Sequence, residues 1–129
     1  TGDLNGDGKP DLVITQIDGP PLVLVNRLGS RPFLRVNLDS GGTNRLGFGA
    51  IVQAGFDERR LASRYVSPTR SYLSQSEGVV TFGFGDETPA LNLDSLPILK
   101  VRWHDGEEQT ISDVPLNQTI TIRKQRRSQ

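Results

Sequence analysis

The sequence predicts an all-β fold, an antiparallel β-sandwich of about seven or more strands. Its apolar residues come in short runs, several of which alternate with polar residues, and turn-forming clusters separate these runs. The chain has 14 Gly and 8 Pro, which favour such turns, and helical spacing of apolar residues is nearly absent. At 129 residues the chain can bury one core, and a second full domain does not fit.

Most of the expected strands follow residue 32. Residues 33–38 alternate with a period of two, so Leu34, Val36 and Leu38 share one face, which we expect to be buried. The pair Asp105-Gly106 predicts a hairpin turn. The expected strands are residues 33–38, 49–56, 61–66, 80–84, 99–103 and 109–111, and a last strand around Ile120 and Ile122.

Two shorter strands are expected nearer the N-terminus. Residues 12–15 and 22–25 flank a loop at 18–21, whose Gly and Pro residues predict a hairpin. We expect the apolar faces of this hairpin to pack onto the domain that follows. The polar segment 27–32 contains Gly and Ser, which is typical of a linker.

The segment 3–11 has the most specific chemistry in the chain. Oxygen donors recur along it at alternate positions, as a hard cation requires, and Gly8 lies where such a loop turns sharply. Calcium takes about six to eight oxygens in irregular geometry, whereas magnesium requires an octahedron, so a crowded carboxylate loop favours calcium. The alternative is a solvated turn that binds nothing, because Asp, Asn and Gly also favour turns. The predicted calcium ligands are the side chains of Asp3, Asn5, Asp7 and Asp11 and the main-chain carbonyl of Lys9.

Composition limits the partners and the setting. Lys and Arg number 15, as do Asp and Glu, so no overall field favours nucleic acid or an anionic membrane. The basic run 123–127 lacks aromatic residues, and we expect a solvated terminus there. The absence of cysteine excludes disulfides and thiolate metal sites, and no apolar run approaches the about 20 residues of a membrane span. Because the chain starts at Thr1 on the metal loop, we expect a fragment of a longer protein.

The segment 64–75 is the second candidate site. It offers hydroxyls, an amide, guanidinium groups and phenol rings, which suit hydrogen bonding to a sugar and stacking on its apolar face. The alternative is that the tyrosines lie in the core and the arginines are solvated. The candidate ligand-binding residues are Arg64, Tyr65, Arg70, Tyr72, Ser74 and Gln75.

No catalytic residues are predicted. His104 is the single histidine, and no Gly-x-Ser-x-Gly turn is present to hold a nucleophile near it. With 15 acidic residues, some pair of carboxylates will lie at a separation suitable for glycoside hydrolysis by chance, so such a pair indicates nothing. We therefore expect the chain not to be an enzyme.

Two family resemblances follow from these motifs. The loop 3–11, followed by a strand, resembles the calcium loop of FG-GAP/VCBS repeats, which form the blades of integrin-like β-propellers. Four later motifs resemble, in order, the ASPIC/UnbV domain, a family found after such repeats in secreted or surface proteins, including the cartilage acidic protein group. The resemblance implies architecture and setting, but no reaction. The four motifs are Asn44-Arg45-Leu46-Gly47-Phe48-Gly49-Ala50, Tyr72-Leu73-Ser74-Gln75, Phe82-Gly83-Phe84-Gly85 and Val101-Arg102-Trp103 with Gly106 close behind.

The resemblances imply four parts: a partial FG-GAP/VCBS repeat at 1–26, a linker at 27–32, an ASPIC/UnbV-like sandwich at 33–124 and a basic tail at 125–129. They imply a secreted, cell-surface or periplasmic protein. We expect a non-catalytic calcium-binding module for adhesion or for recognition of a glycan or an extracellular protein, joined to the rest of a propeller. The alternative is a carbohydrate-binding accessory domain or part of a carbohydrate-active enzyme.

Overall fold

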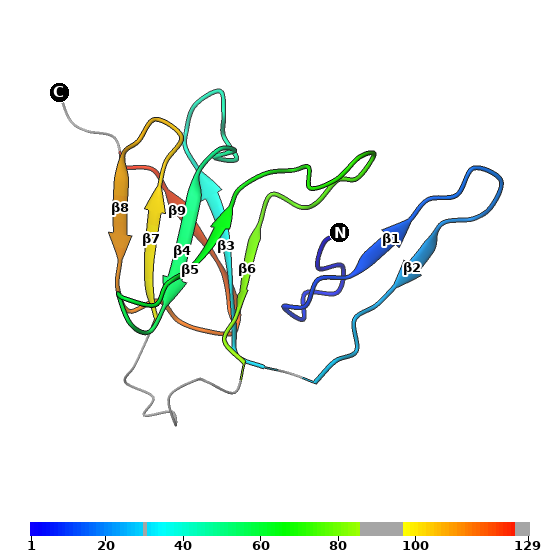
Figure 1. Ribbon diagram of the computed structural model, residues 1–129, viewed down its shortest axis with the longest axis horizontal. Helices are drawn as coiled ribbons and strands as arrows, with labels where there is room; N and C mark the ends of the chain where they lie inside the picture. The colour runs from blue at the N-terminus through cyan, green and yellow to red at the C-terminus, as the bar shows by residue number, and fades with distance from the viewer. Residues whose placement is uncertain (30, 86–96, 126–129) are drawn as a thin grey trace.

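The computed structural model describes residues 1–29, 31–85 and 97–125. In this part of the chain it has nine strands in three small sheets, mostly antiparallel, and no helix, so the predicted all-β fold is confirmed (Figure 1). No helix in the described ranges is long and apolar enough to cross a membrane. Residues 126–129 of the predicted basic tail lie outside the described residues.

Two sheets pack face to face to form the sandwich. The three-stranded sheet has the order β6-β3-β9, and the four-stranded sheet has the order β5-β4-β7-β8 (Figure 1). The seven strands predicted after residue 32 are therefore confirmed, with small shifts at their ends. They are β3 (Phe33–Asp39), β4 (Ile51–Gly55), β5 (Ala62–Tyr65), β6 (Val80–Gly83), β7 (Ile98–Arg102), β8 (Glu108–Ile111) and β9 (Gln118–Arg123).

The apolar core lies between these two sheets. The alternation in β3 has the predicted effect, because Leu34, Val36 and Leu38 are buried while Asn37 is half-buried on the other face. The four-stranded sheet contributes the residues that face them, so the inner faces of the two sheets share one apolar cluster. The buried core residues are Leu34, Val36, Leu38, Ala50, Val52, Ala54, Val66, Val80, Phe82, Leu99, Val101, Trp103, Val114 and Ile122.

One strand pair differs from the expected arrangement. β9 runs parallel to β3, with Leu34 opposite Gln118 and Leu38 opposite Ile122. β8 lies in the other sheet, so the chain must cross the sandwich through residues 112–117, where Val114 is buried, before it reaches β3. After a connection that changes sheets, the next strand can run parallel or antiparallel to its neighbour. Residue alternation is the same for parallel and antiparallel strands, so the sequence does not reveal the parallel pairing.

The turn before β4 explains the first family motif in physical terms. The side-chain amide of Asn44 donates to the carbonyl of Phe48 at 2.6 Å, and its oxygen accepts from the Phe48 N–H at 3.0 Å. Gly47 has φ 66° and Gly49 has φ 89°, a left-handed backbone that side chains disfavour. A Cβ at Gly47 would lie 2.9 Å from Cβ of Leu38. The motif therefore forms a tight turn that lets β4 enter the core.

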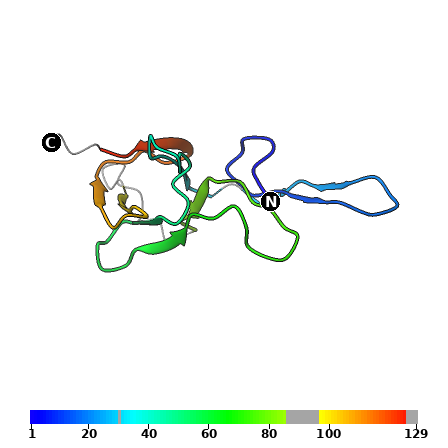
Figure 2. The same cartoon turned by 90° about the horizontal axis from the view of Figure 1, so that it is seen from above.

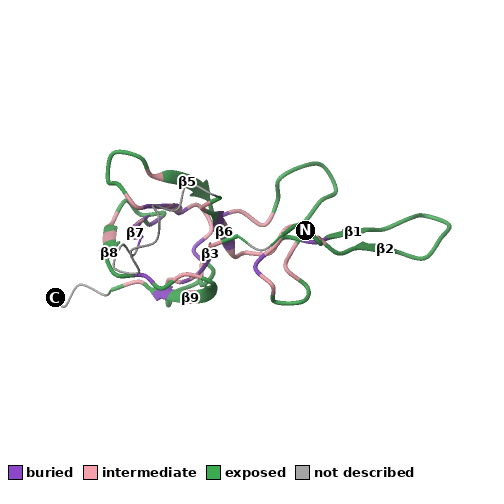
Figure 3. Cartoon of the chain, turned by 90° about the horizontal axis from the view of Figure 1, so that it is seen from below, coloured by how far each residue is buried: buried purple, intermediate pink, exposed green. Residues whose placement is uncertain are grey.

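The N-terminal hairpin stands apart from the sandwich. β1 (Leu12–Ile14) and β2 (Leu22–Leu24) pair antiparallel around the predicted loop, and they extend away from the two larger sheets (Figures 1 and 2). The apolar residues at 12–14 and 22–25 are between 39% and 55% exposed, and the hairpin is coloured as exposed along its length in Figure 3. The prediction that its apolar faces pack onto the following domain is therefore wrong. Only the base of the hairpin approaches the sandwich, so its faces have no layer against them within the described residues.

Candidate functional site

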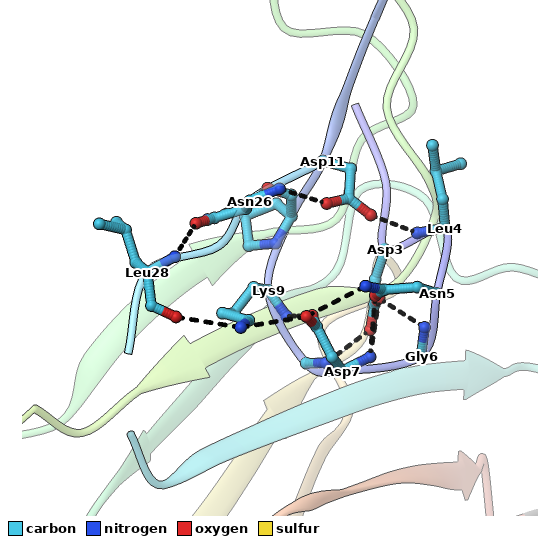
Figure 4. A network of polar contacts seen from close by, with 11 residues as sticks. Asp3, Leu4, Asn5, Gly6, Asp7, Lys9, Asp11, Asn26 and Leu28 are labelled. Carbon is cyan, nitrogen blue, oxygen red and sulfur yellow. Dashed lines mark hydrogen bonds and ion pairs between the residues drawn. The ribbon is translucent and has the colours of Figure 1, made fainter. Parts of the chain in front are cut away.

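The predicted metal loop forms a closed turn at the base of the hairpin (Figure 4). Its ends are joined by two main-chain hydrogen bonds: Gly2 N–H donates to the Asp11 carbonyl at 3.2 Å, and Asp11 N–H donates to the Gly2 carbonyl at 2.7 Å. Gly6 and Gly8 take the left-handed conformation, with φ 76° and 82°. A Cβ at Gly8 would lie 2.3 Å from the ring of Phe33, so a glycine at this position lets the loop rest on the first strand of the sandwich.

The Asp3 side chain is enclosed by the loop and is only 1% exposed. Its Oδ1 accepts from the N–H groups of Gly6 and Asp7 at 2.8 and 3.1 Å, and its Oδ2 accepts from Gly8 at 2.8 Å. Oδ2 also lies 3.2 Å from Nη1 of Arg35. A carboxylate offers about four lone-pair positions, so these four donors occupy all of them.

The middle of the loop is stabilised by a second set of bonds. Asn5 donates to Asp7 Oδ2 at 3.1 Å and accepts from the Asp7 N–H at 3.2 Å. Asp7 Oδ1 accepts from the Lys9 N–H at 3.0 Å, and Nζ of Lys9 lies 3.1 Å from Oδ2. Desolvation acts to raise the pKa of Asp7, but hydrogen bonds and charge from Lys9, together with the bond from Asn5, outweigh it. The pKa therefore lies below its ordinary value.

Asp11 ties the loop to the end of the hairpin. It is 2% exposed, and its two oxygens accept from the N–H groups of Leu4 and Asn26, each at 2.8 Å (Figure 4). Two of its lone-pair positions are left for another partner. The side chain therefore joins the start of the loop to the residues that leave β2.

The donors of this loop fit calcium in type but do not form a cage. Three carboxylates, an amide oxygen and a carbonyl are hard donors of the kind calcium prefers. Within residues 1–29, 31–85 and 97–125, however, no three acidic or other metal-binding side chains converge on one position. Main-chain amides and two cationic side chains, Lys9 and Arg35, occupy the oxygens instead. A cation entering the loop would have to displace Arg35 or an amide from Asp3.

Arg35 connects the loop to the sandwich. It lies on the outer face of β3, where the alternation predicts solvent, yet it is only 9% exposed. Its Nη1 lies 3.2 Å from Asp3 and donates to Thr119 on β9 at 3.3 Å, and its Nη2 lies 2.5 Å from Glu77. Sequence reasoning missed this residue, because nothing in a local pattern shows that the N-terminal loop covers this face.

The chain end is paired with a distant loop. The amino group of Thr1 donates to the Gln75 carbonyl at 2.7 Å, and the Glu77 N–H donates to the Thr1 carbonyl at 2.9 Å. The hydroxyls of Thr1 and Ser76 lie 3.0 Å apart. The long connection between β5 and β6 therefore lies alongside the N-terminus (Figure 2).

The six candidate ligand-binding residues are only partly brought together. Tyr72 is 89% exposed and Tyr65 is 59% exposed, so neither is a core tyrosine. The Ser74 hydroxyl donates within its own turn, to the carbonyl of Ser71. Arg64 and Arg70, in contrast, line one cavity of about 360 Å³, which neither tyrosine lines. The residues lining that cavity are Thr1, Gly2, Pro10, Asp11, Leu12, Arg64, Arg70, Ser76, Glu77, Val79 and Thr81.

A larger cavity, of about 730 Å³, lies on the linker side of the loop. Its walls come from the loop, from the linker and from the near ends of the sandwich strands. Lys9 lines it, but its Nζ already donates to the carbonyl of Leu28 at 3.0 Å and pairs with Asp7. This cavity lies between the hairpin unit and the sandwich. The ammonium group of Lys9 is already paired, so it is not free to bind a ligand there.

His104 is exposed at the turn between β7 and β8. The neighbouring acids, Asp105 and Glu107, both form ion pairs with Lys124, just after β9. The Lys124 side chain lowers the pKa of Asp105 more than desolvation raises it, and the bond to Asp105 raises the pKa of Lys124 above its ordinary value. These acids therefore fasten the end of β9 to the β7–β8 turn.

Comparison with known protein families gives two matches. A family model described as ASPIC and UnbV matches residues 40–129, and a model described as FG-GAP repeat matches residues 1–16. Their order along the chain agrees with the two resemblances in the sequence. No curated protein matches the chain significantly.

Proposed function

The chain belongs to the ASPIC and UnbV family and carries FG-GAP repeat sequence ahead of that domain, and from this premise we propose that it is a calcium-binding, non-catalytic recognition module of a larger propeller protein. We place this protein outside the cytoplasm, in a secreted, cell-surface or periplasmic setting. The module would serve adhesion or binding of an extracellular ligand.

The observation that carries the proposal is the way the loop joins the two units. Asp3 reaches Arg35 on β3, and Gly8 rests on Phe33 of the same strand. Asp11 is bonded to Asn26, at the end of the hairpin. Anything that orders this loop therefore also fixes the joint between the repeat and the sandwich.

Calcium would be held by the side chains of Asp3, Asn5, Asp7 and Asp11 and by the carbonyl of Lys9. The bound ion supplies positive charge that offsets three carboxylates and reduces the conformational entropy of a Gly-rich loop in the folded state. Lys9 and Arg35 supply part of this charge themselves. The chain's own residues thus form the joint, and the ion would strengthen it.

The exposed hairpin is evidence that the chain is part of a larger propeller protein. Its two strands are fewer than the about four of a propeller blade. Both strands expose apolar side chains that a blade would cover with neighbouring strands. We infer that the rest of the repeat is the partner of this hairpin in the complete protein.

The non-catalytic assignment is supported by the surroundings of His104. The acids beside it, Asp105 and Glu107, pair with Lys124, a lysine that is not part of any predicted site. Both carboxylates therefore serve to join the end of β9 to the β7–β8 turn. A hydrolase assay on simple glycosides that gave turnover abolished in His104→Ala would overturn this assignment.

Calorimetric titration of calcium into the protein tests the metal site directly. Wild type should bind one calcium ion, and Asp7→Asn should weaken binding at least about tenfold, because it removes one charged donor. Asp18→Asn is the matched control, since Asp18 is an exposed acid in the hairpin loop outside the donor set. Absence of calcium-specific heat, or equal affinity in Asp7→Asn and wild type, would refute the metal proposal.

A further inference from the structure

The cavity between the N-terminus and the β5–β6 connection contains two arginines that lack acidic partners. Neither Arg64 nor Arg70 forms an ion pair with an acidic side chain of the residues described. The two carboxylates that line the same cavity bond elsewhere: Glu77 pairs with Arg35, and Asp11 accepts from two main-chain amides. Neither guanidinium group is therefore paired with a carboxylate of the cavity wall.

Arg64 is exposed, and two contacts orient its side chain. It lies on the edge strand β5 opposite Val52, and its guanidinium is 5.6 Å from the centre of the Phe82 ring. One of its terminal nitrogens donates to the Ser63 carbonyl at 3.1 Å. Guanidinium has five N–H donors in a rigid plane, so most remain free for a ligand.

The other walls of the cavity suit a polar, hydroxyl-bearing ligand. Thr1, Ser76 and Thr81 supply hydroxyl groups, and Pro10 and Leu12 add small apolar surfaces. The volume of about 360 Å³ falls in the range of small-molecule sites, about 300–1,000 Å³. A bare inorganic anion would leave most of this space and these hydroxyls unused.

We propose that Arg64 and Arg70 bind the carboxylate or sulfate of an anionic saccharide in this cavity, with the ring hydroxyls facing Ser76 and Thr81. Charge-assisted bonds from guanidinium to such groups are among the strongest that proteins make. This inference makes the recognition role proposed above more specific, and it does not depend on calcium. Neither Tyr65 nor Tyr72 lines this cavity, so the predicted stacking of a phenol ring on the sugar is not part of the site.

The test is a titration of ¹⁵N-labelled protein, followed by amide chemical shifts, with D-glucuronate, D-glucose 6-sulfate, D-glucose and inorganic sulfate. All titrations are made in EGTA and repeated with calcium, so that failure of the metal site and failure of this site can be distinguished. We expect glucuronate or glucose 6-sulfate to shift amides near Ser76 and Thr81, and the stronger of the two identifies the anionic group. Glucose should not bind, and inorganic sulfate should bind at least about tenfold more weakly than the sugar.

Three variants decide the role of the arginines. Arg70→Gln should weaken saccharide binding at least about tenfold without affecting folding, because Arg70 is exposed. Arg64→Gln should also weaken binding at least about tenfold. Arg64→Lys should bind more tightly than Arg64→Gln but more weakly than wild type, since lysine keeps the charge but lacks the planar pair of N–H donors of guanidinium. Arg59→Gln, an exposed arginine in the β4–β5 loop, removes the same charge and should leave binding unchanged. No shifts with either sugar, equal losses in Arg59→Gln and Arg70→Gln, or inorganic sulfate binding as tightly as the sugars would overturn the proposal.

Discussion

Replacement of Arg35 by glutamine should destabilise the protein more than the same replacement of any exposed arginine on a strand. Arg35 is 9% exposed and pairs with Asp3 at 3.2 Å and with Glu77 at 2.5 Å. Removing one partner of a buried ion pair costs about 3–5 kcal/mol. Two features reduce this figure here: the Glu77 side chain is 28% exposed, and Asp3 keeps three amide donors. We therefore expect a loss of about 3 kcal/mol.

Urea denaturation in EGTA is the assay. With a slope of about 1.5–2 kcal/mol per molar, the midpoint should fall by roughly 1.5–2 M. The double variant Arg35→Gln/Glu77→Gln should recover part of the loss, because it no longer leaves Glu77 charged without a partner. Arg102→Gln, at an exposed position on β7, is the matched control and should change stability by less than about 0.5 kcal/mol. If Arg35→Gln and Arg102→Gln lose equal stability, the loop is not anchored through Arg35.

Two further predictions concern the sandwich. Asp105 has a lowered pKa, so its contribution to stability is present above its ordinary pKa of 3.8 and is lost as pH falls below that value. Lys124 has a raised pKa, so its contribution is present below 10.5 and is lost as pH rises above it. Urea midpoints of wild type should thus fall at both extremes relative to pH 7, and Lys124→Gln should flatten both changes; an unchanged pH profile would contradict the pairing. Separately, Asn44→Ala should cost about 1–3 kcal/mol, because it leaves both main-chain groups of Phe48 without their partner. Asn37→Ala, which removes one exposed side-chain bond, is its control, and equal losses in the two would refute the role assigned to Asn44.

The sequence predicts the strands well because their signals are local. Alternation over 33–38 gives the buried face of β3, and Asp105-Gly106 gives the β7–β8 hairpin. The motif at 44–50 is recognisable for the same reason, since its Asn and Gly residues act within one turn. Each of these features depends on neighbours within a few residues.

The features that the sequence does not predict all depend on distant contacts. Arg35 alternates as a solvent-facing residue, and its burial comes from the loop 32 residues earlier and from Glu77. The parallel direction of β9 depends on a crossing between sheets. The prediction that the hairpin packs on the sandwich is wrong, because its apolar side chains at 12–14 and 22–25 are 39% to 55% exposed. In the candidate ligand site, the connection between β5 and β6 places Arg70 at the cavity that Arg64 of β5 also lines, and neither Tyr65 nor Tyr72 lines it.

If loop 3–11 binds calcium, as we propose, the ion should stabilise the joint between repeat and sandwich. Thermal unfolding of the wild-type chain is measured in millimolar calcium and in EGTA, with magnesium as control. At about a hundred times its dissociation constant, calcium should add roughly 2.7 kcal/mol, which raises the melting temperature by several degrees. This rise should be specific to calcium and smaller in Asp7→Asn. Equal melting temperatures in calcium and EGTA would contradict the calcium proposal, and the loop would then be a turn held only by its own amides, Lys9 and Arg35.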